Sequence, residues 1–183
     1  MTTKIILHGG FAGHINTQND SFFKEILKDT SDNHKVLLIY FAKDIDKIPI
    51  IKKEDIAQFK RNKGRKKISF EVAKENIFTE QIKTAHIIYI HGGNTLKLLE
   101  TMKKFPNLKK LFEDKTVAGE SAGAYVLSTA FYSKNAGGMF RGLGLVPVQT
   151  ICHYTGENED KLAENKKIKT LLLPDYKYQV FVT

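Results

Sequence analysis

The residue best suited to chemistry is a serine between two glycines, in the run Gly119-Glu120-Ser121-Ala122-Gly123. The run fits the pattern Gly-x-Ser-x-Gly, in which a strand turns sharply into a helix and projects the hydroxyl outward. An apolar strand pattern precedes it and a helical pattern follows. Backbone N–H groups at the start of such a helix can stabilise an oxyanion. The run predicts Ser121 as a nucleophile; the plainer alternative is a packing turn with an incidental serine.

A serine hydroxyl needs a base, and His153 is the only histidine that follows Ser121 in the chain. No acidic residue lies between Ala122 and Cys152, so the order nucleophile, acid, histidine is excluded for this pair. The acid is therefore expected after the histidine. Asp175 is the best placed because it follows a buried run stopped by proline, but other acidic residues remain possible: Glu157, Glu159, Asp160 and Glu164.

Four other polar residues carry weaker signals, three of them near expected strand ends and Arg141 on a glycine-rich loop. His91 is a candidate substrate contact or alternative base, or it merely caps a strand. Glu120 could tune the nucleophile, although a solvent-facing carboxylate at the rim is favoured. Asn94 is predicted first as a helix N-cap and second as a substrate contact. Arg141 could clamp a substrate carboxylate, with a surface arginine as the favoured alternative.

No metal site or cofactor is predicted. His8 and His14 are separated by a glycine-containing loop, and no carboxylate joins them at ligand spacing. Cys152 is next to His153, but adjacent strand residues point to opposite faces, so it is predicted to be a core thiol.

The elements that must position these residues follow from hydrophobic periodicity. Near-continuous apolar runs predict buried strands: Lys4 to His8, Lys35 to Phe41, Lys66 to Val72, His86 to His91, Thr116 to Gly119, Gly144 to Cys152 and Tyr178 to Val182. Amphipathic segments between them predict helices: Asp20 to Lys28, Lys52 to Lys63, Asn76 to Thr84, Thr95 to Lys103, Ala122 to Ala130 and Glu159 to Leu172. The alternation predicts a three-layer α/β/α fold with a mostly parallel central sheet, whose strand ends carry the site.

Length and composition set the broad class. The 183 residues suit a single domain spanning 1–183. No apolar run reaches the roughly 18 residues that span a bilayer, and the first strand pattern is too short for a signal peptide. A lone cysteine allows no intrachain disulfide, which favours the cytoplasm. The net charge of +9 comes mostly from lysine, whereas nucleic-acid readers favour arginine, so no nucleic-acid partner is predicted.

Taken together, three runs resemble the peptidase E (aspartyl dipeptidase) and cyanophycinase family: Ile88-Tyr89-Ile90-His91-Gly92-Gly93-Asn94-Thr95, then Gly119 to Ala124, then Gly142 to Pro147 with His153-Tyr154. The resemblance implies a fold like that of class I glutamine amidotransferases and serine peptidase activity. It makes Ser121 the nucleophile and His153 the general base. It puts oxyanion donors at the backbone of Gly93, Gly92 and Ala122, and the acid at Asp175.

The sequence departs from the family pattern in three places. Relatives often have three glycines before the asparagine, whereas this chain has His91-Gly92-Gly93. The arginine with which peptidase E grips an aspartyl side chain is replaced by Glu164 or a neighbour, so specificity for N-terminal aspartate is not expected. Many relatives continue beyond Thr183, and a shorter C-terminal segment is expected to change the sheet edge or the substrate pocket.

The sequence therefore predicts a peptidase acting on small peptides through an acyl-enzyme, as a monomer or homodimer without membrane attachment. Two alternatives remain. One is a related amide or ester hydrolase on the same scaffold, and the other is a catalytically silent binding protein.

Overall fold

The computed structural model describes residues 2–13, 15–28, 32–162 and 167–183. Within these residues the central sheet has the strand order β10-β1-β5-β4-β2-β3. All neighbouring strands are parallel except β10, which pairs antiparallel with β1. The strands are β1 (Lys4–His8), β2 (Asn33–Ile39), β3 (Lys67–Val72), β4 (Ile87–Ile90), β5 (Thr116–Glu120) and β10 (Tyr178–Val182).

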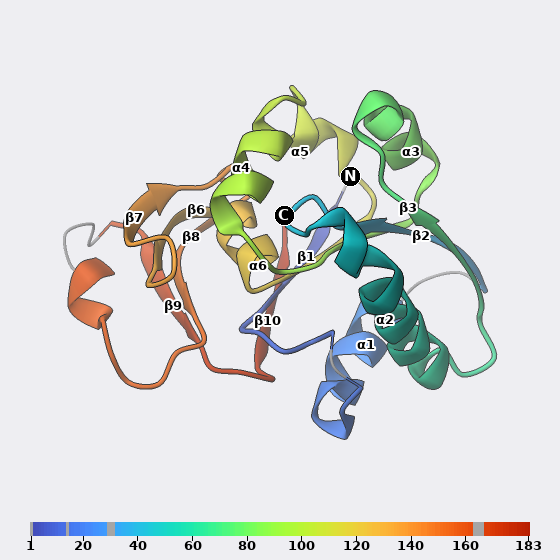
Figure 1. Cartoon of the computed structure of the whole chain (residues 1–183), viewed down its shortest axis with the longest axis horizontal. Coiled ribbons are helices and arrows are strands. Elements are labelled where there is room, and N and C mark those ends of the chain that lie inside the picture. The colour runs from blue at the N-terminus through green and yellow to red at the C-terminus, as the bar shows by residue number, and fades with distance from the viewer. Residues whose placement is uncertain (1, 14, 29–31, 163–166) are drawn as a thin grey trace.

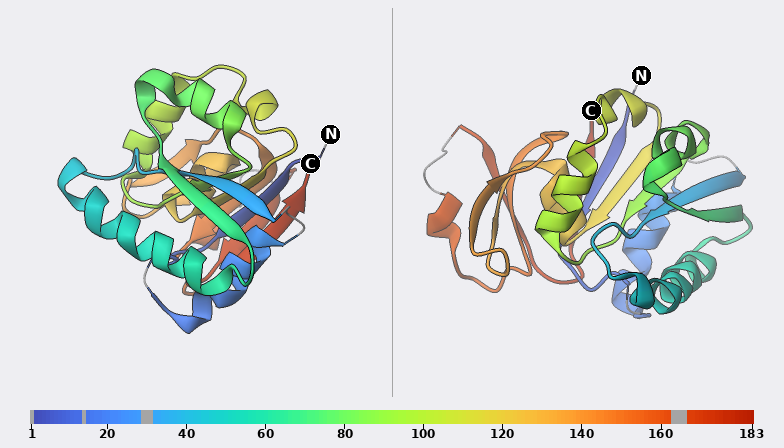
Figure 2. Two further views of the ribbon diagram at one scale, coloured as in Figure 1. Left: turned by 90° about the vertical axis from the view of Figure 1, so that its right-hand side faces the viewer. Right: turned by 45° about the horizontal axis from the view of Figure 1, so that its top comes forward.

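Helices cover both faces of this sheet, as Figures 1 and 2 show. Alternate strand residues point to opposite faces, which explains why both faces are apolar. One face packs against α1 (Asp20–Leu27) and α2 (Ile48–Asn62) through Phe22, Phe23 and Phe59. The other packs against the remaining helices: α3 (Phe78–Thr84), α4 (Thr95–Lys103), α5 (Leu108–Leu111) and α6 (Ala122–Leu127). The predicted mostly parallel sheet between two helical layers is confirmed, and it is compatible with the glutamine amidotransferase-like fold.

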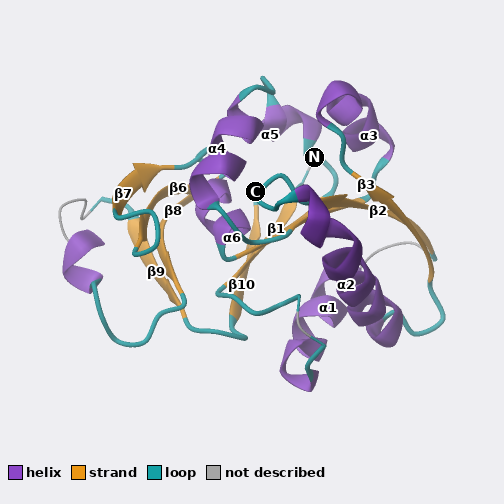
Figure 3. Cartoon of the chain, viewed as in Figure 1, coloured by secondary structure: helices purple, strands orange, loops and turns teal. Residues whose placement is uncertain are grey.

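A second sheet, which the sequence did not predict, lies beside the first (Figure 3). Its strand order is β7-β6-β8-β9, and helix α6 packs between β8 and the central sheet. The strands are β6 (Ser128–Ser133), β7 (Gly138–Arg141), β8 (Val146–Cys152) and β9 (Lys169–Leu173). The strand expected over Gly144 to Cys152 therefore belongs to this sheet and not to the central one.

Two predicted helices end early or are absent. The helix expected over Ala122 to Ala130 stops at Leu127, where the Ser128 hydroxyl binds Ala124 O and Thr150 Oγ1, both at 2.8 Å, and ties the chain to β8. The helix expected over Glu159 to Leu172 is wrong. Residues Glu159–Leu162 form one 3₁₀ turn, residues 163–166 lie outside the described part, and the final segment is β9. The run Leu171-Leu172-Leu173 is a strand because it pairs with β8.

Strand register explains where the site forms. His8 of β1 is opposite Glu120 of β5, and Ile90 of β4 is opposite Gly119. The loops that follow these three strands therefore leave the sheet side by side, at the carboxyl ends where ligands bind in such folds. In the second sheet Cys152 is opposite Leu173, which places the segments after β8 and β9 next to each other.

Candidate active site

The turn at Ser121 has the geometry of a nucleophile elbow. Strand β5 ends one residue before the serine and α6 begins one residue after it, with Ser121 at φ 49° and ψ −107°. A positive φ is uncommon for a residue with a side chain and persists only where surrounding packing imposes it. A Cβ on Gly119 would lie 2.6 Å from the Gly123 carbonyl carbon, and one on Gly123 would lie 2.5 Å from Ile90 O. Both glycines are therefore sterically required.

The structure brings Ser121, His153 and Asp175 into one hydrogen-bonded chain. Ser121 Oγ lies 2.8 Å from His153 Nε2, and His153 Nδ1 lies 2.6 Å from Asp175 Oδ1. An ionised carboxylate accepts hydrogen bonds only, so Nδ1 carries the imidazole proton and Nε2 is free to accept the serine proton. The imidazole and carboxylate side chains are 40% and 33% exposed, so the site opens to solvent.

Among the described residues, none of the other acidic candidates forms a hydrogen bond with His153. Glu159 accepts a hydrogen bond from the Tyr154 hydroxyl, and Asp160 pairs with Lys161 at 3.0 Å. Glu157 lines a pocket beside the serine, and Glu164 is outside the described residues.

The loop after β1 supports the histidine, a role that sequence reasoning missed. His153 N donates to Gly9 O at 3.0 Å, and Tyr176 N donates to Gly10 O at 3.2 Å. A Cβ on Gly10 would overlap the His153 imidazole. The Phe11 ring packs edge-on against that imidazole, with a centroid separation of 5.4 Å. The available signal was the glycine pair directly after the first strand.

A second turn, His91-Gly92-Gly93-Asn94, joins β4 to α4 beside the serine. Asn94 Oδ1 accepts from Lys97 N at 3.0 Å, so it caps α4 as its first interpretation predicted. Gly92 N already donates to Glu120 Oε1 at 2.8 Å. The amides of Gly93 and Ala122 donate to no acceptor in the part of the chain that the structure describes. Those two N–H groups are therefore available to a ligand.

A buried set of charged residues lies under this turn. Glu120 is only 5% exposed, so the expectation of a solvent-facing rim carboxylate was wrong: the loop after β1 covers it, and Ala12 N donates to its Oε2 at 3.2 Å. His91 Nε2 lies 3.5 Å from Glu120 Oε1, and His91 Nδ1 lies 2.9 Å from Asp55 Oδ2. Asp55, which no sequence signal singled out, also accepts from the Tyr40 hydroxyl at 2.8 Å.

The pKa directions in this set show that Glu120 and His91 stabilise each other's charge. Burial by itself raises the pKa of Glu120, but His91 and the Gly92 amide outweigh it and hold that pKa below its usual value. Burial likewise favours neutral His91, yet Glu120 and Asp55 together raise the His91 pKa. Burial raises the pKa of Asp55 against the opposing effect of His91.

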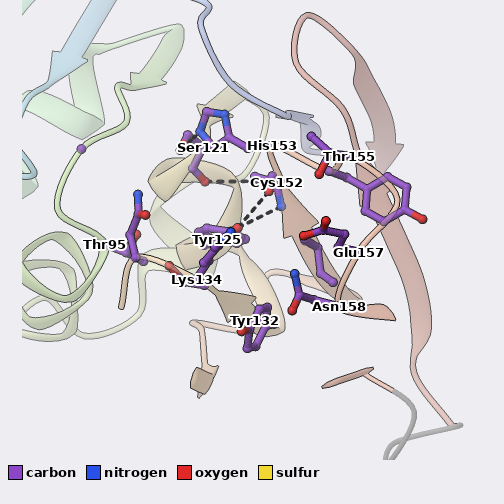
Figure 4. A pocket seen from close by; sticks show the side chains of 15 residues that line it. Thr95, Ser121, Tyr125, Tyr132, Lys134, Cys152, His153, Thr155, Glu157 and Asn158 are labelled. Atoms are coloured by element: carbon purple, nitrogen blue, oxygen red, sulfur yellow. Dashed lines mark hydrogen bonds between the residues drawn. The ribbon is translucent and has the colours of Figure 1, made fainter. Parts of the chain in front are cut away.

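Two pockets flank the serine and share Gly93, Ser121, Asn135 and His153. One, of about 260 Å³, extends toward the second sheet, and Figure 4 shows Ser121 and His153 across it from Tyr132 and Asn158. The other, of about 360 Å³, extends toward α2 and the loop after β1, past Phe11, Lys43, Ile51 and Glu54. A bound chain thus has room on both sides of the hydroxyl. Arg141 ends β7 and lines neither pocket.

Other candidate groups do not form a site. Cys152 is buried beside the serine backbone, and burial raises the pKa of its thiol well above the usual range, which keeps it protonated. Burial lowers the pKa of His8 to about 4, and His14 lies outside the described residues. Over the described ranges no group of three or more histidine, cysteine, aspartate or glutamate residues could hold a metal ion. Nor does any described helix have the length and apolarity to cross a membrane.

The chain is similar to known peptidases in sequence and in fold. A family model described as peptidase family S51 matches residues 5–172. A crystal structure of a peptidase from an acI-B1 actinobacterium has a TM-score of 0.72 at 22% identity, covering 99% of this chain and 84% of that one. A "Putative Peptidase E Protein" from Listeria monocytogenes EGD-e has a TM-score of 0.67 at 18% identity, covering 100% and 98%. Both likenesses establish the fold. Comparison with curated proteins gives no match.

Proposed function

The chain belongs to peptidase family S51 and is a serine peptidase, and from this premise we propose that Ser121, His153 and Asp175 form its catalytic triad and cleave small peptides through an acyl-enzyme. The observation that carries the proposal is the continuous pair of contacts, 2.8 Å from Ser121 Oγ to His153 Nε2 and 2.6 Å from His153 Nδ1 to Asp175 Oδ1. Nucleophile and base lie within hydrogen-bond reach, and the base is oriented by a third group.

In the first half-reaction His153 Nε2 takes the proton from Ser121 Oγ as the oxygen attacks the peptide carbonyl carbon. The amides of Gly93 and Ala122 hold the resulting oxyanion, and each such donor contributes about 3 kcal/mol of transition-state stabilisation. The C–N bond then breaks, and the leaving amine departs with the proton from His153.

In the second half-reaction water attacks the acyl-serine ester, with His153 again acting as the base. The acid product leaves, and the proton returns to Ser121 Oγ. Asp175 fixes the Nδ1–H tautomer and stabilises the imidazolium in both steps. No cofactor takes part in this scheme.

Labelling with a fluorophosphonate probe tests the nucleophile. The wild type is expected to label at Ser121 and to cleave peptides, whereas Ser121→Ala should do neither. Cys152→Ala is the control, because its thiol is buried and protonated; this variant should still label. A wild type that neither labels nor cleaves any peptide would favour the silent binding protein, and labelling lost in Cys152→Ala would contradict the serine assignment.

A substrate panel tests the substrate class. Dipeptides with N-terminal aspartate, other dipeptides, β-linked aspartyl peptides and simple esters are compared by kcat/KM. Cleavage of several dipeptides without preference for aspartate is expected. Activity on esters or simple amides alone would instead favour the related hydrolase.

A further inference from the structure

Glu120, the residue immediately before the nucleophile, joins the two loops that flank Ser121. Its Oε1 accepts from Gly92 N at 2.8 Å in the turn after β4, and its Oε2 accepts from Ala12 N at 3.2 Å in the loop after β1. The first turn carries the Gly93 amide, and the second loop supports the His153 imidazole. One buried carboxylate therefore contacts both halves of the site.

The turn after β4 is fixed at three points, and Glu120 is one of them. His91 N donates to Ile39 O at 3.1 Å, and Asn94 N donates to Ala42 O at 3.0 Å. Between these anchors the Gly92 N–H is held by Glu120. The Gly92–Gly93 peptide, which carries the Gly93 N–H, lies between the held Gly92 N–H and the anchored Asn94 N–H, and these contacts restrict where the Gly93 N–H points. That N–H donates to no acceptor among the described residues.

We propose that Glu120 is a positioning residue that aligns the Gly93 oxyanion donor with the imidazole of His153, and that His91, held by Asp55, compensates its buried charge. The proposal rests on the function assigned above to Ser121. It gives Glu120 and His91 a different role from direct substrate contact, because both carboxylate oxygens of Glu120 and Nδ1 of His91 are engaged within the protein.

The charge of Glu120 must be compensated because a negatively charged oxyanion forms near it during the reaction. An isolated buried carboxylate beside a developing oxyanion would repel it, and Coulomb interactions are strong where water is excluded. His91 sits between two carboxylates, 2.9 Å from Asp55 and 3.5 Å from Glu120. As an imidazolium it offsets the charge nearest the nucleophile, and Asp55 with the Tyr40 hydroxyl keeps it in place.

The test uses Glu120→Gln, which keeps the size of the side chain but can accept only one of the two amides through its single oxygen. We expect kcat to fall about 10²-fold, as for loss of an oxyanion donor, with KM within about threefold of the wild type. Affinity for a peptide aldehyde, which forms a tetrahedral adduct on the serine, should fall with kcat. An unchanged kcat, or a raised KM at unchanged kcat, would overturn the proposal, the latter because it marks a substrate contact.

The matched control is Glu71→Gln. Glu71 lies on β3, accepts from Gln81 Nε2 at 2.7 Å and pairs with Lys35, away from both pockets. It should leave kcat and KM unchanged. Glu120→Asp provides a second variant in case Glu120→Gln fails to fold, because it keeps the charge next to His91 but is too short to reach both amides. It should show the same loss of kcat.

A double-mutant cycle tests the charge compensation. His91→Gln alone leaves Glu120 without its cation and should lower kcat, whereas adding Glu120→Gln removes the uncompensated carboxylate. The double variant should therefore be about tenfold more active than the product of the two single effects predicts. All kcat values are measured well below the unfolding temperature of each variant. If the two substitutions lower kcat independently of each other, the compensation is contradicted.

Amide exchange separates failure of this proposal from failure of the proposed function. Hydrogen exchange at Gly92 and Ala12, measured by NMR without substrate, should be faster in Glu120→Gln while exchange in β2 is unchanged. If the wild type cleaves no peptide and labels with no probe, the proposed function fails. The amide-exchange rates then still test whether Glu120 positions the two loops. Unchanged exchange at both amides would overturn the proposal whatever the activity.

Discussion

At the scale of single residues, Asp175 shows how a short side chain can reach the histidine in the proposed triad. Its carboxylate follows β9 directly, after Pro174, and reaches His153 Nδ1 at 2.6 Å. The resemblance to the peptidase E family implied an acid in a Leu-Pro-Glu-like segment, and aspartate is one methylene shorter than glutamate. Strand register brings the two segments together, because Cys152 and Leu173, which lie just before His153 and Asp175, are paired neighbours.

The first prediction concerns this carboxylate. Asp175→Asn should lower kcat by about 10²- to 10⁴-fold with little change in KM, because the imidazole loses its tautomer control and the stabilisation of its cation. Steady-state kinetics on the best dipeptide would measure it. Asp160→Asn is the control, since Asp160 is an exposed carboxylate paired with Lys161; an equal loss in that variant would refute the assignment.

The second prediction concerns His8, whose pKa burial lowers from 6.5 to about 4. The folded protein keeps this imidazole neutral while the unfolded chain protonates it, so protons favour unfolding. Above pH 6.5 His8 is neutral in both states and costs no stability. As the pH falls from 6.5 toward 4, its protonation in the unfolded chain lowers the free energy of unfolding by about 3 kcal/mol in all. His91, with its raised pKa, acts in the opposite direction, so variants must be compared.

Urea unfolding of the wild type and His8→Gln, at about pH 7 and about pH 5, isolates the effect of His8. The variant should lose less stability on acidification, since glutamine does not titrate there. Equal losses in the two proteins would contradict this account.

How far the sequence predicts the site depends on whether a signal is local. Ser121 is marked by its neighbours, and His153 by being the sole histidine after it. Asp55 has no such mark: it lies on α2, 36 residues from His91, in a segment that reads as an ordinary amphipathic helix. Glu120 looked exposed because its cover, the loop at Ala12, comes from 108 residues away.

At the scale of elements, the sequence predicts the central sheet well and the second sheet poorly. Strands β1 and β10 and helix α4 have the predicted bounds, since their apolar pattern is continuous or helical over their full length. Strand β7 has four residues, alternately half-buried and exposed, which is too short for a periodic signal. Helix α6 is followed by β6 without a loop, so its apolar run reads as one longer helix.

The third prediction concerns the loop after β1. Gly10 has φ +147°, and a Cβ there would overlap the His153 imidazole. Gly10→Ala should therefore displace the base and lower kcat by about 10²-fold or more, as for a misplaced catalytic group. Kinetics combined with thermal unfolding would measure it.

Gly64→Ala is the matched control, because Gly64 also has a positive φ, +58°, but has open space around it. It should cost about 1 kcal/mol of stability through backbone strain and leave activity intact. Full activity in Gly10→Ala would show that the loop does not set the position of the histidine.

At the scale of the whole molecule, the site lies where two sheets meet. Ser121 follows a strand of the central sheet, His153 follows a strand of the second, and Asp175 lies on the connection between β9 of the second and β10 of the first. The predicted fold placed nucleophile and base on one sheet. Because Ser121 and His153 follow strands of different sheets, their relative position depends on the contact between the sheets, which runs mainly through α6.

The fourth prediction follows from the net charge of +9. A protein of this charge attracts anionic substrates over distances that salt screens. Of two peptides that differ only in carboxylates far from the scissile bond, the anionic one should lose kcat/KM by about threefold or more when ionic strength rises from about 10 mM to about 150 mM. The neutral peptide should lose little, and equal losses would rule out steering.

The pairing of the first strand with the last has a consequence for biosynthesis. Lys4 of β1 is opposite Val182 of β10, and the proposed acid lies only a few residues before β10. While the ribosome is still adding residues, the nascent chain can form the turn at Ser121 but has neither the acid nor the strand that closes the sheet edge. In the proposed triad, the site is therefore incomplete until both Asp175 and β10 have been added to the chain.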